Sequence, residues 1–315
     1  MRQTCLDQVY LLAKADPRVV FIGSDLGAGT LRKFKEEMPE RFFMEGVSEA
    51  HIVGMAAGMA LEGSIVYVNT ISTFITRRCF EQVAVDLCLH NLNVRLIGNG
   101  GGLVYAPLGP THLAIEDISI FRALPNMTVV AVADAEEMRR FMPQTLDHRG
   151  PIYIRLAKGG DPVVTNDKVQ FRIGKSLLMR EGRDALLVTT GVTLKIALDA
   201  AEMLSRSGIE AAVLHMPTVK PLDEEAFLDH ASRSRVIVAV EENTIIGGLG
   251  SALAEAISEA GFNPARKFKR IGVPDRFPDK YGSQANLLDY YGINAQRVVA
   301  TVESLAGRRQ AGRYA

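Results

Sequence analysis

The sequence has no tryptophan and only three cysteines among its 315 residues. Cys5, Cys79 and Cys88 form no CxxC pair and have no histidine at zinc-ligand spacing, which argues against a disulfide framework and a structural zinc site. An odd number of scattered thiols is typical of a cytosolic protein in which cysteines pack as small hydrophobic side chains. The cysteines therefore favour a cytoplasmic chain without a metal site of its own.

A long apolar run is also missing. The longest uncharged stretch, residues 96–115, is broken by glycines, prolines, Asn99 and His112, so it does not suit a membrane-spanning helix. The first residues lack the apolar core of a signal peptide, which agrees with a cytoplasmic location. Neither charge is in excess, because 36 basic residues match 36 acidic ones. We therefore expect no membrane and no nucleic acid among the partners.

The chain instead alternates short apolar runs with segments of helical periodicity, a pattern typical of parallel sheets covered by helices on both faces. A polar, turn-rich stretch interrupts the alternation once. We predict an α/β fold with two domains, residues 1–160 and 179–315, joined by a linker over residues 161–178. The predicted strands are 19–22, 41–43, 65–68, 94–97, 127–131 and 152–154, then 186–189, 210–214, 236–240 and 268–271, with helices that include 77–90 and 136–147.

Residues 43–63 combine a carboxylate with a helix rich in glycine and alanine. Ser48 is suited to cap this helix, and Glu49 falls in its first turn, where unpaired backbone N–H groups favour a negative charge. Polar residues are absent from 52 to 61, so we expect the body of the helix to be buried. Small residues such as Gly54 and Gly58 allow another backbone or a flat ligand to come close. A carboxylate at the mouth of a buried helix requires a partner.

Several polar or aromatic residues follow directly after predicted strands, at the edge where parallel sheets bind ligands. Asp25 and Glu49 are carboxylates at this edge, and His112 is either a structural or a catalytic histidine. Arg155 can form a salt bridge there or bind a substrate anion. Phe74 can belong to the core or stack on a heteroaromatic ring.

Two glycine-rich stretches could bind phosphate. Residues 98–102 lack the Lys-Ser/Thr of a P-loop and the spacing of a dinucleotide site, so we predict a flexible loop on the substrate side. Residues 247–250 precede a helix and can either bind an anion or permit close packing. We favour packing for this second stretch.

Five segments, in order along nearly the whole chain, resemble the C-terminal half of the transketolase family of thiamine diphosphate enzymes. The Gly-Val-Ser-Glu run at 46–49 is similar to the family's Gly-Ile/Val-x-Glu, and residues 73–82 are similar to its Ser-Phe-x-x-x-Arg-x-x-Glu-Gln segment. The resemblance implies a pyrimidine-binding first domain and the family's C-terminal domain as the second. The other similar segments are Gly-Pro-Thr-His at 109–112 with Glu116, Asp117 and 124–129, then 217–223 and 241–250.

The resemblance assigns residues to the cofactor. In the family, the residue that matches Glu49 hydrogen-bonds a ring nitrogen of the aminopyrimidine, and this bond promotes loss of the thiazolium proton. Glu49 is therefore implied to be catalytic and to carry a proton in the resting site, which a buried apolar setting favours. Phe74 is implied to stack on the pyrimidine, and Asp25 and Arg78 are implied to lie at the cofactor site.

The resemblance also assigns residues to the substrate, which it implies is a sugar phosphate. His112 matches a substrate-facing hydrogen-bond donor and is the second residue expected to be catalytic. Arg155 and Arg2 match contacts to the phosphate group. The implied reaction transfers a two-carbon ketol unit between sugar phosphates.

A Gly-Asp-Gly motif with a downstream asparagine, which holds magnesium and diphosphate in this family, is missing from the sequence. We therefore expect the diphosphate-binding domain to be absent from this chain and to be supplied by a separate N-terminal subunit. That subunit would hold most of the magnesium site, because the metal needs hard oxygen ligands. The expected assembly is an α2β2 heterotetramer with the cofactor at its interfaces.

Three positions differ from the family pattern. Leu108 stands where transketolases have an Asp before Gly-Pro-Thr-His, Gly100 stands where a phosphate-contacting His is usual, and Gly29 replaces a Ser. Each charge-assisted hydrogen bond that is lost is worth ~1.5–3 kcal/mol. These differences predict a less usual ketose or a differently bound acceptor.

Three alternatives stay open. An enzyme like deoxyxylulose phosphate synthase would condense pyruvate with an aldehyde. The β subunit of a 2-oxoacid dehydrogenase has about this length, although residues 109–129 fit transketolase better. A catalytically silent scaffold or regulatory subunit is compatible with Leu108 and Gly100, whereas Glu49 and Phe74 argue for a catalytic role.

Overall fold

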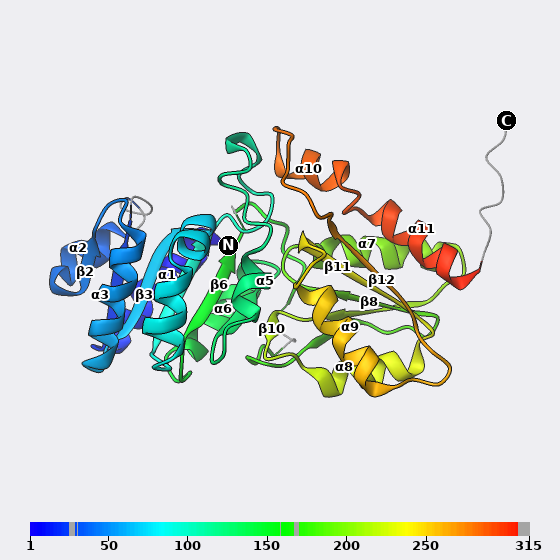
Figure 1. Ribbon diagram of the computed structural model, residues 1–315, viewed down its shortest axis with the longest axis horizontal. Coiled ribbons are helices and arrows are strands. Elements are labelled where there is room, and N and C mark those ends of the chain that lie inside the picture. Colours follow the sequence, from blue (N-terminus) through cyan, green and yellow to red (C-terminus); the bar gives the residue numbers. More distant parts are fainter. Residues whose placement is uncertain (25–28, 30, 158, 167–169, 308–315) are drawn as a thin grey trace.

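The computed structural model describes all residues except 25–28, 30, 158, 167–169 and 308–315. Two sheets lie side by side, the first formed mainly by the N-terminal half of the chain and the second by the C-terminal half (Figure 1). No helix in this described part of the chain is long and apolar enough to cross a membrane.

The first sheet has seven strands in the order β10-β5-β6-β4-β3-β1-β2. All neighbouring pairs are parallel except β10 with β5. The central strands are buried along their whole length, as expected for a sheet covered on both faces. The strands are β1 (Val19–Gly23), β2 (Phe42–Met44), β3 (Ile65–Ile71), β4 (Val94–Asn99), β5 (Thr128–Ala131), β6 (Ile152–Leu156) and β10 (Thr218–Lys220).

Helices cover this sheet on both faces, because successive strand residues point to opposite sides. On β3, Val66 and Val68 pack in the same core cluster as Ile52 of α3. Ile65 and Tyr67 pack in another cluster with helices α1 and α6. The helices are α1 (Arg2–Ala15), α2 (Arg32–Glu37), α3 (Glu49–Leu61), α4 (Phe80–Gln82), α5 (Asp117–Arg122) and α6 (Ala135–Phe141), with short 3-10 turns η1 (Pro39–Arg41), η4 (Ala106–Leu108) and η5 (Met142–Thr145).

The helix predicted over 77–90 is present but differs in geometry. It begins with a π-helical turn, η2 (Phe74–Arg78), and after α4 it continues as a second π-helical segment, η3 (Val83–Cys88). Wider π turns are rare and are frequently found at functional sites. Sequence periodicity does not distinguish them from α-helix, so the prediction missed them.

The second sheet has five strands in the order β12-β11-β8-β9-β7, and only the edge strand β7 is antiparallel to its neighbour. Helices α7 and α11 pack in one core cluster with this sheet, and α8 and α9 pack in another. The mostly parallel α/β fold predicted for both halves is confirmed. The elements are β7 (Leu177–Arg180), β8 (Ala185–Thr189), α7 (Thr193–Arg206), β9 (Ala211–His215), α8 (Glu224–Arg233), β11 (Val236–Thr244), α9 (Leu249–Ala260), β12 (Lys267–Val273), α10 (Gln284–Tyr290) and α11 (Ala295–Ala306).

Strand β10 connects the two halves. It belongs to the C-terminal half in sequence, yet it pairs with β5 at the edge of the first sheet (Figure 1). Further backbone hydrogen bonds join the halves, from Ala131 N–H to the Pro217 carbonyl (2.8 Å) and from Gly191 N–H to the Ala131 carbonyl (2.9 Å). Strand β7 also begins inside the segment predicted as a linker. The two halves are therefore joined by strand pairing and backbone hydrogen bonds as well as by the connecting segment.

Candidate active site

Helix α3 begins at Glu49, as the sequence predicts, but its first turn is arranged differently. Ser48 occupies the N-cap position without capping the helix, and its hydroxyl donates instead to the Glu45 carbonyl (2.8 Å). This bond closes the turn between β2 and α3, where Gly46 has a positive φ of 65°. The turn buries the Glu49 side chain, which is only 1% exposed.

The sequence predicts that the body of α3 is buried, but in this single chain one face of the helix is exposed. One face, including Ile52 and Val53, packs on the sheet. On the opposite face, Gly54 and Gly58 are exposed, and a Cβ atom at either position would meet nothing within 4 Å. Leu61 on the same helix is 64% exposed. The small residues thus form an open surface to which another backbone can come close.

The partner of Glu49 is Arg78. A guanidinium nitrogen of Arg78 lies 2.5 Å from Glu49 Oε2, while the arginine side chain itself stays 48% exposed. Glu49 is buried as expected, and the partner that its carboxylate requires is a charged hydrogen-bond donor. The expected proton on Glu49 stays a prediction. The ion pair explains how a carboxylate can be buried at this position.

Phe74 joins this pair to His112. The Arg78 guanidinium lies over the Phe74 ring at 4.6 Å from its centroid. The His112 ring meets the Phe74 ring edge-on, with centroids 5.3 Å apart and planes at 63°. Glu49, Arg78, Phe74 and His112, all proposed from the sequence, therefore lie consecutively at the carboxyl edge of the first sheet.

His112 sits on a loop after β4 whose backbone is closely packed. Its N–H donates to the Gly109 carbonyl (3.0 Å), and its Nδ1 lies 2.9 Å from the Thr111 hydroxyl. Gly109 has a positive φ of 75°, and a Cβ there would come within 2.8 Å of the Tyr281 ring from the C-terminal half. Leu108, which differs from the family pattern, is 52% exposed beside this loop.

Arg155 is buried and donates its hydrogen bonds to groups of this chain. Its Nε donates to Asp117 Oδ2 (2.8 Å), and one terminal nitrogen donates to the carbonyls of Ala114 (3.1 Å) and Glu242 (2.7 Å). Arg155 is 7% exposed and Asp117 is fully buried. Burial acts to lower the pKa of Arg155, but the Asp117 and Glu242 carboxylates outweigh it and raise the pKa. The arrangement matches the structural salt bridge and gives no support to a phosphate contact.

The glycine-rich stretch 98–102 is not the flexible loop that we expected. Its residues are buried, and neighbouring side chains fill the space that a Cβ would need. At Gly100 the Tyr105 ring would lie 2.0 Å from such an atom. Arg155 occupies the corresponding space at Gly101, and Glu242 occupies it at Gly102. These glycines permit close packing, and at Gly102 the packing joins the first half to Glu242 of the second half.

Residues 247–250, for which the sequence left anion binding and close packing open, show both features. The N–H groups of Leu249 and Gly250, at the start of α9, donate to the two carboxylate oxygens of Glu241 at 2.8 and 2.9 Å. The helix N-terminus therefore binds an anion, but the anion belongs to this chain. Burial raises the pKa of the Glu241 carboxyl to about 7, although the two N–H groups act in the opposite direction.

The two remaining predicted residues are less informative. Asp25 lies outside the described residues. Arg2 is the first residue of α1, and the sulfur of its neighbour Met1 accepts a hydrogen bond from the Ala157 N–H (3.4 Å), directly after β6. This places Arg2 near the carboxyl edge of the sheet, and its role as a phosphate contact stays a prediction. No group of three or more His, Cys, Asp or Glu among the described residues is arranged to bind a metal ion.

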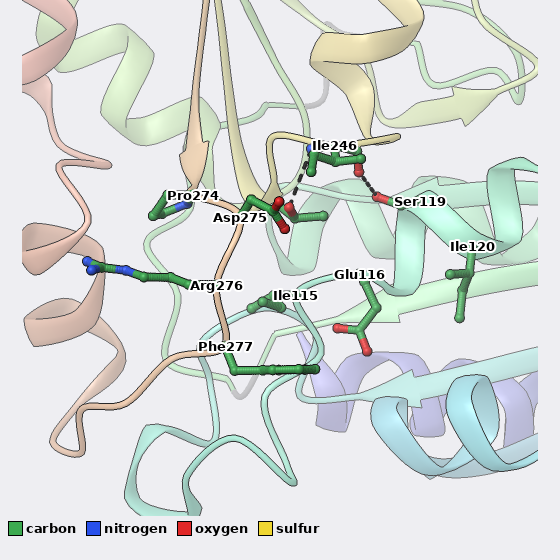
Figure 2. A pocket seen from close by; sticks show the side chains of 10 residues that line it. Ile115, Glu116, Ser119, Ile120, Ile246, Pro274, Asp275, Arg276 and Phe277 are labelled. Carbon is green, nitrogen blue, oxygen red and sulfur yellow. Dashed lines mark hydrogen bonds between the residues drawn. The ribbon is translucent and has the colours of Figure 1, made fainter.

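A cavity of about 510 Å³ lies between the two halves, beside the site rather than in it (Figure 2). The side chain of Phe277 extends from the loop after β12 toward Glu116 at the start of α5, whereas Arg276 points away. Phe277 is 70% exposed. The lining residues are Ile115, Glu116, Ser119, Ile120, Thr244, Ile246, Pro274, Asp275, Arg276 and Phe277.

Sequence reasoning missed the ion pairs around this loop. Glu116 pairs with Arg77, and Asp117 pairs with Arg155, although 39 and 38 residues separate the partners. The sequence offered only a partial signal, because Arg155 directly follows the predicted strand 152–154, whereas Arg77, Glu116 and Asp117 do not adjoin a predicted strand. Opposite charges concentrated at one edge of a sheet can indicate such pairs, but they do not show which residues pair.

The chain matches two family models that together cover most of its length. Residues 1–160 match the model described as "Transketolase, pyrimidine binding domain". Residues 174–298 match the model described as "Transketolase, C-terminal domain". A solved structure described as "Split gene transketolase, inactive beta4 tetramer" superposes with a TM-score of 0.89, with 34% sequence identity over 98% of this chain and 99% of that chain.

Curated relatives of similar length are named as subunits. The 6-deoxy-6-sulfo-D-fructose transketolase subunit SqwH from a Clostridium species is 37% identical over 98% of this chain and 95% of that relative. An apulose-4-phosphate transketolase subunit from Phocaeicola vulgatus is 34% identical, covering 95% of each chain. A 1-deoxy-D-xylulose-5-phosphate synthase from Geobacter sulfurreducens is 37% identical over 97% of this chain, which spans only 48% of that relative.

Proposed function

Because this chain belongs to the transketolase family, we propose that it is one subunit of a two-component, thiamine diphosphate-dependent transketolase. In this proposal the enzyme transfers a two-carbon ketol unit between sugar phosphates. The supporting observation is the contiguous row of Glu49, Arg78, Phe74 and His112 at the carboxyl edge of the first sheet.

The residues in this row fit an aminopyrimidine. The Arg78 guanidinium is a planar group that donates to Glu49 and lies over the face of Phe74. An aminopyrimidine is also planar, carries hydrogen-bond donors and favours stacking on an aromatic ring. The pair formed by Glu49 and Phe74 thus already accommodates a group with the properties that the cofactor requires. In this proposal the pyrimidine takes the place of the guanidinium over Phe74, and Arg78, whose side chain is 48% exposed, shifts toward the solvent side of Glu49.

Each residue then has a distinct task. Glu49 holds a proton at the ring nitrogen of the pyrimidine, and Arg78 orients its carboxylate. Phe74 fixes the plane of the ring by stacking. His112 donates a hydrogen bond to an oxygen atom of the substrate, with its ring oriented by Phe74 and Thr111. Thiamine diphosphate, when bound, supplies the nucleophilic carbon and the electron sink for the two-carbon unit.

We propose that a separate N-terminal subunit supplies the diphosphate and magnesium sites. The magnesium–diphosphate motif is missing from this sequence, and relatives that are named as subunits match this chain over 95% of their own length. The open face of α3 offers a surface for that subunit next to Glu49. It continues onto the neighbouring helix, where Val85 is 47% exposed and Leu89 is 71% exposed. The proposed assembly is an α2β2 heterotetramer.

Our proposal for the substrate class rests on the positions around His112 that differ from the family pattern. Gly100 has no side chain to offer the site, Tyr105 fills the space that a Cβ there would need, and Leu108 offers no charge. Relatives with similar overall identity are named for a sulfo-sugar and for apulose 4-phosphate rather than for common pentose phosphates. We therefore propose a less usual ketose as the donor.

A second candidate is a synthase that condenses pyruvate with an aldehyde phosphate. It is favoured by the 37% identity to the deoxyxylulose phosphate synthase from Geobacter sulfurreducens. Consumption of pyruvate with release of carbon dioxide would identify this reaction. Reductive acylation of a lipoyl domain would instead identify a 2-oxoacid dehydrogenase.

The test is reconstitution with the N-terminal subunit, thiamine diphosphate and magnesium, followed by an assay of two-carbon transfer from a panel of ketose phosphates. Glu49→Ala should abolish transfer. Glu62→Gln is the matched control, because Glu62 is an exposed carboxylate at the opposite end of the same helix. Equal turnover by wild type and Glu49→Ala would refute the proposed role of this site.

A further inference from the structure

One π-helical turn, Phe74–Arg78, contacts both ends of the proposed site. Arg78 bonds Glu49 on the cofactor side, and Phe74 packs against His112 on the substrate side. Arg77 lies between these two residues in sequence. Neither the sequence patterns nor the proposed function gives Arg77 a role.

Arg77 bonds the backbone on both sides of His112. One terminal nitrogen donates to the Pro110 carbonyl (3.1 Å), and the other donates to the Leu113 carbonyl (2.9 Å). These two carbonyls flank the dipeptide formed by Thr111 and His112. A single guanidinium therefore fixes the ends of the segment that presents the histidine.

Glu116 fixes Arg77 in turn. Its carboxylate accepts from Nε of Arg77 through one oxygen and from a terminal nitrogen at 3.0 Å through the other. Four of the five N–H donors of Arg77 are thus used, two on Glu116 and two on the loop. Such a two-pronged arrangement depends on the planar fork of arginine, which lysine does not have.

We propose that Arg77 is a positioning residue that holds His112 at the edge of the active site, with Glu116 as the residue that orients Arg77. This inference rests on the proposed function for the role of His112. The Arg77 side chain is 31% exposed and the Glu116 side chain is 26% exposed. Ion pairs as accessible as this one contribute little to overall stability. The pair is therefore better explained by local geometry than by stability.

The test is a double-mutant cycle in the reconstituted complex. Arg77→Ala should lower kcat/KM by roughly 10- to 100-fold, because small displacements of a positioned group carry losses of that order. His112→Ala should lower it at least as much. The double variant should be no worse than His112→Ala alone, because Arg77 acts only through the histidine. Additive losses, or an unchanged kcat/KM for Arg77→Ala, would overturn the proposal.

Two further variants test whether the loss of activity is specific to the guanidinium of Arg77 and to its contacts beside His112. Arg77→Lys retains the charge and should recover less than a third of the lost activity; full recovery would contradict a role for the guanidinium fork. Arg122→Ala is the matched control, because Arg122 also makes an ion pair and a carbonyl contact, with Glu255 and Gly247, but away from His112. It should leave kcat/KM within about twofold of wild type.

Amide hydrogen exchange separates this proposal from the proposed function. In the isolated chain, Arg77→Ala should speed exchange at the His112 amide, which donates to Gly109, by roughly tenfold or more while the β4 amides stay protected. Unchanged exchange at His112 would overturn the positioning role even if the complex is active. A complex without ketol transfer but with faster exchange would refute the function and leave the positioning role supported.

Discussion

Replacing Arg155 with methionine should destabilise the folded chain without weakening the binding of a phosphate-bearing substrate. Methionine has a similar length and fits beside Gly101, which already contacts the aliphatic part of Arg155. The substitution removes the hydrogen bonds to Asp117, Ala114 and Glu242. It leaves the Asp117 carboxylate buried with the Tyr153 hydroxyl (2.6 Å) as a remaining partner.

The magnitude follows from this burial. Removing one partner from a buried ion pair typically costs about 3–5 kcal/mol, because the other charge is left without compensation. Asp117 is 0% exposed, so water cannot replace the arginine. At roughly 2 °C per kcal/mol for a chain of this size, the Tm should fall by about 6–10 °C.

Urea and thermal unfolding of the isolated chain are suitable assays, and Arg180→Met is the control. Arg180 also pairs with a carboxylate, Glu210, at 3.1 Å, but the two side chains are 30% and 46% exposed. A pair of this kind contributes about 0–1 kcal/mol. Only Arg155→Met should show the large loss.

The reasoning fails if Arg155→Met unfolds within about 1 kcal/mol of wild type while the reconstituted enzyme shows a raised KM for its sugar phosphate. That combination would mean that Arg155 moves out of its buried position to bind substrate. It would restore the phosphate contact implied by the sequence resemblance.

Three further predictions concern stability and assembly. Relative to Glu241→Gln, the wild-type chain should lose stability in urea titrations as the pH rises from about 4.5 to 7. The pKa of Glu241, raised to about 7 in the folded chain, keeps its carboxyl protonated there after the same carboxyl has ionised in the unfolded chain. A stability difference that does not change with pH would contradict this. Gly58→Leu should stabilise the isolated chain by about 0.5–1 kcal/mol through helix propensity but weaken binding of the N-terminal subunit at least roughly tenfold by calorimetry; unchanged binding would show that the open face of α3 is not the interface. Gly100→His should lower stability by about 1–3 kcal/mol rather than restore a phosphate contact, because its Cβ would meet the Tyr105 ring; a stable variant with a lower KM would refute this.

The fold could be predicted from the sequence because its signals are local. Most of the short apolar runs, such as 65–68 and 94–97, became buried strands, and the pattern of alternation indicated a parallel sheet. The strands at the sheet edges are less buried, as β2 and β12 show. Pairing between distant segments has no such signal. The strand at 218–220 lies in a recognisable segment, yet its place at the edge of the first sheet depends on contact with β5 about 90 residues earlier.

In the candidate site, too, the individual residues have local sequence signals, whereas the contacts between them have none. Glu49, Phe74, Arg78 and His112 could be proposed because each follows a strand in a recognisable pattern. The contacts among them could not, since the 2.5 Å bond from Arg78 to Glu49 joins two different helices. The two alternatives for Arg155 stayed open for the same reason, because its partner Asp117 is found only when the strand and the helix are packed together. Sequence patterns therefore indicate which residues gather at one edge of the sheet, but they do not separate ligand contacts from internal ion pairs.

Exchange of the thiazolium C2 hydrogen for deuterium, followed by NMR, tests the central claim most directly because it requires no knowledge of the sugar. The complex of wild-type chain and N-terminal subunit should speed this exchange far beyond that of free thiamine diphosphate. Glu49→Gln should slow it by roughly 100-fold or more, a loss typical of removing an acid–base group. Exchange as fast in Glu49→Gln as in the wild-type complex would contradict the proposal that Glu49 activates the cofactor.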